Sequence, residues 1–244
     1  MRILGITSYN GTKYQGWQTQ PNGPTIQEEI EKVLSQYFNQ DITIVGSGRT
    51  DAGVHALRQY FHFDLDVDSV DIDRMIYSIN MMLPQDIKIL DFEQVEDDFH
   101  ARFSAKEKHY GYTISLEQKE VFFYETLYVC PYKLDIKLMK DAITYFVGKH
   151  NFKNFTSKEE DEDNFVREIY NASIDCENNF INFDFRGNGF MRYEIRFIVG
   201  TLVEIGRGKL SIDELKNLLD DNSERKIVSF KAPASGLMLV DVIY

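Results

Sequence analysis

The sequence predicts an α+β protein built from two similar halves. Segments in which apolar and polar residues alternate are typical of half-buried strands, and they recur in both halves of the chain. Between them lie segments whose apolar residues follow the period of an amphipathic helix. With 244 residues, 43% of them hydrophobic and 14% aromatic, the chain can bury the core of one large domain or of two small ones.

The first half predicts the element order β-α-β-β-α-β of a split βαβ, ferredoxin-like (RRM-like) unit. It opens with an alternating strand at residues 2–9. Thr25 followed by Glu28 is a capping-box pattern, which predicts that a helix begins there. The apolar face of that helix comprises Ile26, Ile30, Val33, Leu34 and Tyr37. The remaining elements expected are strands at 42–45, 59–63 and 87–95 and a helix at 71–82.

The second half has a similar alternation of strands and helices. We place the predicted domains at residues 1–105 and 106–244. Glu177, Asn178 and Asn179 predict a hairpin turn, and Gly206 predicts the end of a helix. The strands expected are 108–116, 165–176, 180–186 and 237–243, and the helices are 134–147, 190–205 and 212–219.

Composition excludes several classes of protein. The N-terminus lacks the basic start and apolar block of a secretory signal, and no apolar run is long enough to span a membrane. Cys130 and Cys176 lie far apart and outside any C-x-x-C pattern, which argues against a disulfide scaffold or a structural zinc site. These observations favour a cytoplasmic protein.

The charge balance is acidic, with 27 basic and 39 acidic residues and a formal net charge of -12. Much of the excess gathers in runs at 64–68, 96–98 and 159–163, which we interpret as solvated surface and a flexible loop in preference to an acidic docking tail. A nucleic-acid binder is expected to carry a basic footprint. An RNA-binding interpretation therefore requires the basic residues to converge elsewhere.

A glycine-rich loop at 46–53 carries one carboxylate, Asp51, between two predicted strands. Small neighbours let a bulky substrate approach that backbone closely. Taken alone, the pattern also fits an Asx turn in which Asp51 bonds its own backbone and Arg49 is merely exposed. The local residues leave both interpretations open.

Residues 48–56 read Gly-Arg-Thr-Asp-Ala-Gly-Val-His-Ala. This string resembles, residue for residue, the signature of the tRNA pseudouridine synthase A family. The similarity extends along almost the whole chain in collinear order, through residues 11–18, 98–105, 187–192, 195–202 and 232–237.

The resemblance implies two α+β halves whose mostly antiparallel sheets join into one, with helices on one face and a central cleft. It also implies a cofactor-free isomerase, generally a homodimer, that acts on the anticodon stem-loop of tRNA around positions 38 to 40. Asp51 then corresponds to the family nucleophile. Whether the carboxylate attacks C6 of the base, attacks C1′ or assists a glycal route stays open.

By the same resemblance, Arg196 is the cationic partner that offsets an ionised Asp51 in a partly dry cleft. The residues around Arg196 are largely apolar, which predicts a buried guanidinium. The alternative is an exposed arginine that bonds Glu194 or another surface acid. Residues two positions apart point to different faces of a helix, which makes a bond to Glu194 the weaker explanation.

Tyr110 occupies the position that packs against the target base in similar enzymes, where its hydroxyl could also relay the C5 proton. An isolated strand tyrosine is more often a packing residue, and Tyr112 fits that role. The resemblance assigns Arg49 to a phosphate or to the space left by a flipped nucleotide. Cations that could converge on RNA lie in or near the matching blocks and are Lys13, Arg58, Arg102, Lys106, Lys108, Arg167, Arg186, Arg192, Arg207 and Lys209.

Other motifs in the sequence do not indicate a metal site or a phosphate-binding loop. No H-E-x-x-H or similar metal spacing accompanies His55 and His62, so we expect both to be structural. Residues 206–209 follow a helix and lack the spacing of a phosphate-binding loop. Two other functions fit the same scaffold less well: a non-catalytic module that binds or folds tRNA, and an Asp-based hydrolase, for which clustered metal-binding carboxylates are missing from the sequence.

Overall fold

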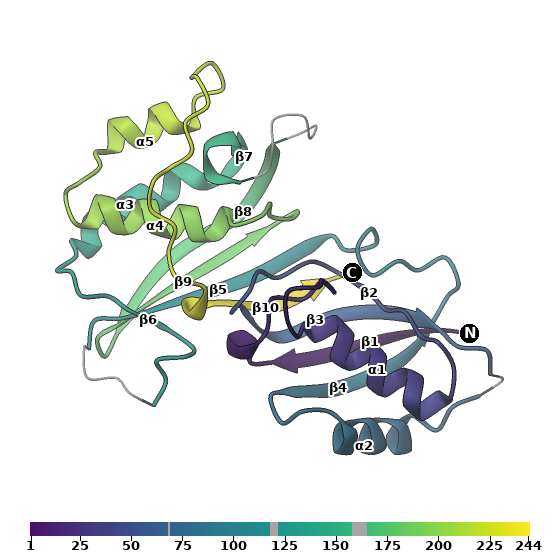
Figure 1. The fold of residues 1–244 in the computed structure, drawn as a ribbon. Helices are drawn as coiled ribbons and strands as arrows, with labels where there is room; N and C mark the ends of the chain where they lie inside the picture. The colour runs from purple at the N-terminus through teal and green to yellow at the C-terminus, as the bar shows by residue number, and fades with distance from the viewer. Residues whose placement is uncertain (68, 118–121, 158–164) are drawn as a thin grey trace. The chain divides into compact units, whose positions relative to one another are not determined.

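The computed structural model describes residues 1–67, 69–117, 122–157 and 165–244. The chain forms two compact units, one of Met1–Lys106 with Met238–Tyr244 and one of Glu107–Leu237. Each unit combines helices with mostly antiparallel strands (Figure 1), which confirms the predicted α+β class. The acidic run at 159–163 lies outside the described residues.

The first unit has the predicted order of strands and helices. The strands pair in the order β4-β1-β3, with antiparallel neighbours. β2 pairs with the later part of β3 in antiparallel register, and β10 pairs with its first residues in parallel register. The elements are β1 (Arg2–Tyr9), a 3-10 turn (Gly11–Lys13), α1 (Ile26–Phe38), β2 (Val45–Gly46), β3 (His55–Asp64), α2 (Ile72–Met82), β4 (Ile87–Val95) and β10 (Leu237–Ile243).

α1 begins where the capping pattern predicts. The Thr25 side chain accepts a hydrogen bond from the Glu28 N–H, and Asn39 ends the helix in the left-handed conformation. The apolar face of α1 is buried except for Tyr37, which is half-buried, and α2 packs against both α1 and β4. The aromatic core of the unit comprises Trp17, Phe61, Phe63 and Phe92.

The strand expected at 42–45 is shorter than predicted and reduces to Val45–Gly46. Ile42 and Ile44 are buried, but their N–H groups bond to side chains of α1 and not to a neighbouring strand. The Ile44 N–H donates to Glu31 Oε1 at 2.9 Å, and the Ile42 N–H donates to Ser35 Oγ at 3.0 Å. Because these side chains satisfy the backbone donors, no ladder is needed there.

The second unit contains an antiparallel sheet in the order β5-β9-β8-β7, and β6 pairs with β5 in parallel register. α3 and α4 pack on each other and cover one face of this sheet (Figure 1). The elements are β5 (Glu107–Ser115), β6 (Tyr128–Val129), α3 (Ile136–Ile143), β7 (Gly148–Asn151), β8 (Val166–Glu177), β9 (Phe180–Gly187), α4 (Glu194–Gly206) and α5 (Ile212–Leu219), with 3-10 turns at Thr144–Phe146, Lys153–Phe155 and Ala234–Gly236.

The hairpin between β8 and β9 has the turn that the sequence predicts. Asn178 and Asn179 have φ values of 50° and 66°, as both central residues of a type I′ turn require. Glu177 and Phe180 pair across this turn. Asparagine tolerates the left-handed region better than most residues, so two local side chains set the register of this hairpin.

Three boundaries in the second unit differ from the sequence prediction. The helix expected at 134–147 begins after its cap Asp135 and ends at Ile143, beyond which the chain tightens into a 3-10 turn. The helix expected at 190–205 begins at Glu194, because Tyr193 is left-handed with a φ of 64° and interrupts the helical backbone. The short strands β6 and β7 have too few residues to show alternation, and the sequence did not predict them.

In the part of the chain that the structure describes, no helix is both long and apolar enough to cross a membrane. Within the same residues, no three His, Cys, Asp or Glu side chains gather into a group that could hold a metal ion. Cys130 is buried, Cys176 is exposed, and both are free thiols.

His62 is a buried structural histidine of β3, as the sequence predicts. It is 5% exposed, and its Nδ1 accepts a hydrogen bond from the Ala101 N–H at 3.1 Å. Burial, together with the nearby Arg2 and His100, lowers the pKa of His62 to about 4. The folded protein therefore holds a neutral imidazole at pH values where the unfolded chain takes up a proton.

This difference predicts an acid-sensitive stability. Because the pKa of His62 is lower in the folded state, its contribution is complete above about pH 6.5 and is lost as the pH falls from there to about 4. The free energy of unfolding should fall by on the order of 3 kcal/mol over this pH range. Urea unfolding followed by Trp17 fluorescence should show it, and His62→Asn, which keeps an acceptor but does not titrate, should flatten this part of the profile. Identical pH profiles for the two proteins would contradict the prediction.

Candidate active site

Asp51 lies on the loop of residues 47–54 that joins β2 to β3. Its side chain is half-buried, whereas that of Arg49 is exposed. The Val54 N–H donates to the Asp51 carbonyl at 3.1 Å, and Gly53 has a φ of 76°, so the chain turns immediately after the carboxylate. This turn needs a glycine at position 53.

The segment of residues 11–17 packs against one side of this loop. The Trp17 N–H donates to the Thr50 carbonyl at 3.1 Å, and the Gly53 N–H donates to the Tyr14 carbonyl at 3.3 Å. A Cβ atom at Gly16 would lie 2.6 Å from the Thr50 carbonyl oxygen, and the φ of Gly16 is 95°. The close approach of these two backbones therefore explains why glycine occupies position 16.

The other side of the loop is tied to β3. The Ser47 N–H donates to the Tyr60 carbonyl at 2.7 Å, and the Ser47 hydroxyl donates to Gln59 Oε1 at 2.7 Å. The Gln59 amide in turn donates to the Gly48 carbonyl at 2.7 Å. The loop that carries Asp51 is thus hydrogen-bonded at both ends, which limits how far its carboxylate can move.

His55 begins β3 directly after the loop. It is 2% exposed, and its Nδ1 accepts a hydrogen bond from the Gly11 N–H at 3.1 Å. The histidine therefore joins the two glycine-containing segments, which confirms the structural role that the sequence predicts.

Arg196 lies in the first turn of α4 and is 9% exposed, so the predicted burial of its guanidinium is confirmed. Its Nε donates to the Ala232 carbonyl at 2.9 Å, and the Ala232 N–H donates back to the Arg196 carbonyl at 3.0 Å. The guanidinium carbon lies 5.2 Å from the centre of the Tyr193 ring. This reciprocal pair of bonds fixes the direction of the arginine side chain.

Tyr110 lies on β5 opposite Phe185 of β9 and is 8% exposed. Its ring meets Phe190 edge to face, with centroids 5.4 Å apart. Tyr112, two residues on, is 1% exposed, and its hydroxyl donates to the Pro233 carbonyl at 2.8 Å. Tyr112 is therefore the packing residue that the sequence predicts.

Glu194 is a buried carboxyl, which the sequence analysis named only as a surface acid that could bond Arg196. It is fully buried at the start of α4, and Oε2 accepts a hydrogen bond from the Met191 N–H at 2.8 Å. No hydrogen-bond partner of Oε1 lies among the described residues. Burial raises the pKa of Glu194 to about 8. Its position as the lone carboxylate between Asp184 and Glu204 was the signal that could have identified it.

The raised pKa of Glu194 predicts that the protein loses stability as the pH rises. The folded state keeps a proton that the unfolded chain releases, so stability falls as the pH rises from about 4.5 to about 8. Over the whole range, the free energy of unfolding should fall by on the order of 5 kcal/mol. Glu194→Gln removes this titration, and its free energy of unfolding should fall less than that of the wild type over this range. Chemical denaturation followed by far-UV circular dichroism tests this, and equal slopes for the two proteins would refute it.

Several cations that the sequence offers for RNA have carboxylate partners within their own unit. Lys13 lies 3.3 Å from Asp86, and Arg58 lies 3.3 Å from Asp241. The other two pairs are Arg186 with Asp184 at 3.4 Å and Arg207 with Glu204 at 2.6 Å. These contacts reduce the positive charge that the four residues can offer to RNA, and the convergence of the remaining cations stays a prediction.

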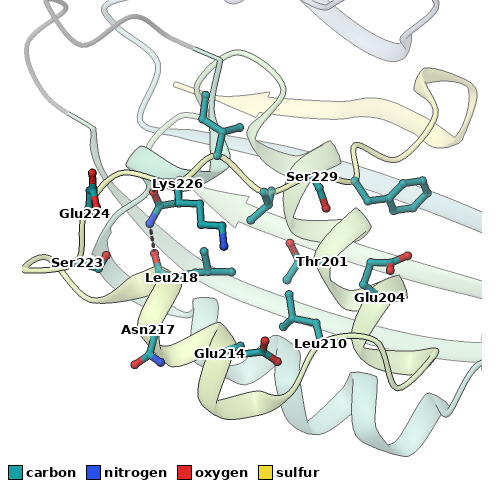
Figure 2. Close-up of a pocket in the computed structure, with 14 residues that line it drawn as sticks. Thr201, Glu204, Leu210, Glu214, Asn217, Leu218, Ser223, Glu224, Lys226 and Ser229 are labelled. Carbon is teal, nitrogen blue, oxygen red and sulfur yellow. Dashed lines mark hydrogen bonds between the residues drawn. The ribbon is translucent and has the colours of Figure 1, made fainter.

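A cavity of about 390 Å³ lies in the second unit between α4, α5 and residues 223–230 (Figure 2). The buried Asn154 is one of the residues that line it, and its amide donates to the Leu218 carbonyl at 2.8 Å and accepts from the Lys226 N–H at 2.6 Å. Asp51, Arg49, Tyr110 and Arg196 do not line it. The cavity is therefore separate from the residues that the sequence assigns to the site.

Known proteins show similarity to this chain along its whole length. The family model described as "tRNA pseudouridine synthase" matches residues 6–104 and 142–244. A protein of Bacillus pumilus (strain SAFR-032) named tRNA pseudouridine synthase A is 40% identical, over 100% of this chain and 99% of its own. The protein of the same name from Geobacillus sp. (strain WCH70) is 41% identical, over 100% and 98%.

A solved structure gives a weaker match. One chain of the structure titled "Crystal Structure of a Cbf5-Nop10-Gar1 Complex" is 12% identical, with a TM-score of 0.37, over 83% of this chain and 45% of that chain. A similarity at this level carries no inference, whereas the sequence relatives match at full length.

Proposed function

Because this chain belongs to the tRNA pseudouridine synthase family and is an isomerase that makes pseudouridine, we propose that it modifies uridines at positions 38, 39 or 40 of the tRNA anticodon stem-loop. Asp51 acts as the nucleophile. The full-length similarity to enzymes of that name is the observation that carries the proposal. A homodimer in the cytoplasm is part of the same proposal.

The reaction is an isomerisation. The bond between N1 and C1′ of the uridine breaks, the uracil turns while it stays bound, and a bond forms between C5 and C1′. The proton on C5 leaves and N1 gains one, so the step needs no oxidant or reductant. An ionised carboxylate beside the sugar and base can supply the nucleophile.

The loop geometry supports this role for Asp51. Hydrogen bonds hold the loop at both of its ends, and the neighbours Ala52 and Gly53 are small. A nucleophile on a fixed backbone reaches its target without the entropy cost of ordering a mobile loop. The half-buried position of Asp51 leaves part of the side chain accessible to substrate.

The other three residues receive the roles that the resemblance implies. Arg196 balances the charge of Asp51, and its buried, directed guanidinium suits a buried ion pair. Tyr110 packs against the target base, and its hydroxyl serves the C5 proton. The exposed Arg49 contacts a phosphate or fills the space that the everted nucleotide leaves.

Tritium release tests the proposal directly. A tRNA labelled at C5 of uridine loses tritium when C5 bonds to the ribose, so the purified protein should release it. Transcripts in which cytidine replaces uridine at position 38, 39 or 40 identify the nucleotide, because release should stop when the modified position is replaced. Absence of release from any uridine, with tRNA binding retained, would support the non-catalytic module. Release that does not depend on positions 38 to 40 would overturn the positional claim.

Because the chain carries a net charge of -12, binding of tRNA requires a local basic surface, which salt titration can detect. A complex with at least six phosphate contacts loses about 10³-fold in affinity between about 50 and 200 mM salt. We expect a loss of this size for tRNA, measured by filter binding. An affinity that salt leaves unchanged would exclude a phosphate-binding surface.

A further inference from the structure

Two buried hydroxyl groups contact each other, and one of them belongs to Thr50, the residue directly before Asp51. The Tyr9 hydroxyl and Thr50 Oγ1 lie 2.8 Å apart in a buried environment. Tyr9 is 4% exposed and Thr50 is 7% exposed. The bond links the end of β1 to a loop residue 41 positions away in sequence.

Tyr9 is a fixed point of the first unit. Its backbone is in register with Ala56 of β3 on one side and with Ile87 of β4 on the other. Its ring packs against Trp17, with centroids 6.1 Å apart. A group held in this way can position whatever its hydroxyl binds.

Thr50 is held by a second bond through its backbone. Its carbonyl accepts from the Trp17 N–H at 3.1 Å. The bond to Tyr9 adds a second restraint through the Thr50 side chain. The orientation of the next residue, Asp51, follows from the orientation of Thr50.

We propose that the hydroxyl pair of Tyr9 and Thr50 is a positioning device that sets the direction of the Asp51 carboxylate for the isomerisation. This inference rests on the proposed role of Asp51. Neither residue needs to touch the substrate. Both act through the peptide that joins Thr50 to the nucleophile.

The alternative is that the bond contributes only to folding stability, and conservative variants separate the two roles. Tyr9→Phe and Thr50→Val each remove one hydroxyl and keep the apolar volume. A misdirected nucleophile lowers the rate of the chemical step, so we expect kcat at saturating tRNA to fall about 10- to 100-fold with KM little changed. Thr50→Ser restores the hydroxyl and should recover most of the rate.

Thr7→Val is the matched control. Thr7 lies on the same strand, is 0% exposed, and donates its hydroxyl to the Lys88 carbonyl at 3.0 Å. Its loss also removes a side-chain hydrogen bond from the first unit, one that is partly buried and lies at the boundary with β4. We expect a comparable loss of stability in urea unfolding and an unchanged kcat.

The double variant Tyr9→Phe with Thr50→Val should be no slower than the slower single variant, because both changes break the same bond. The inference is overturned if the single variants keep the wild-type kcat while losing stability as Thr7→Val does, or if Thr50→Ser is as slow as Thr50→Val. Asp51→Ala is assayed in parallel. Wild-type turnover by that protein overturns the proposed function itself, whereas an inactive Asp51→Ala beside a fully active Tyr9→Phe overturns only the positioning role.

Discussion

Replacing Asp51 by Asn should abolish pseudouridine formation, with kcat lowered by roughly 10⁴-fold or more. The amide has nearly the same shape as the carboxylate but carries no charge, so it cannot act as the nucleophile. The fold should survive, because hydrogen bonds of neighbouring residues and backbone groups hold this loop. Single-turnover tritium release at saturating tRNA measures the effect.

Asp91→Asn provides the control for the change in charge. Asp91 is an exposed residue of β4 in the same unit, and its replacement removes one negative charge at a distance from the loop. Its kcat should match that of the wild type. If Asp51→Asn released tritium at a comparable rate, Asp51 would not be the nucleophile.

If Arg196 balances the charge of Asp51 as proposed, replacing Arg196 by Met should lower kcat by about 100-fold or more, because the loss of one partner of a charge pair costs about 2–5 kcal/mol. Methionine fills the space of the arginine stem but offers neither the charge nor the bond to Ala232. Without the cation, the ionised carboxylate is less favourable, so the acidic limb of the kcat profile should move to higher pH. Arg196→Lys keeps the charge without the planar geometry and should be intermediate.

Arg225→Met controls for the loss of a bond between an arginine and a backbone carbonyl. Its Nε donates to the Lys153 carbonyl at 3.1 Å, which resembles the bond of Arg196 to Ala232. Both variants should lose similar stability in chemical denaturation, and only Arg196→Met should lose turnover. Normal turnover with an unshifted pH profile would remove Arg196 from the mechanism.

The sequence predicts some features of the candidate site and does not predict others. The motif at 48–56 predicts site roles for Asp51 and Arg49 only through resemblance, and these stay predictions. The apolar neighbours of Arg196 predicted its burial, which the structure confirms. The bond between Tyr9 and Thr50 was not predictable, because hydroxyl groups 41 residues apart leave no pattern in the sequence. Glu194 lay inside an expected helix, and the prediction that placed the helix start before it concealed its role at the first turn.

By itself, the sequence determined the features that depend on neighbouring residues. The Thr25 cap, the Asn178–Asn179 turn and the strand β4 are each encoded within a few positions, and each lies where it was predicted. Only the tertiary structure decided how far β2 extends and where α4 begins. At β2, side chains of α1 satisfy the backbone donors of Ile42 and Ile44, and at α4 a left-handed Tyr193 and the buried Glu194 set the first turn. Such outcomes depend on which distant groups reach a backbone donor or a buried space, and local periodicity does not record them.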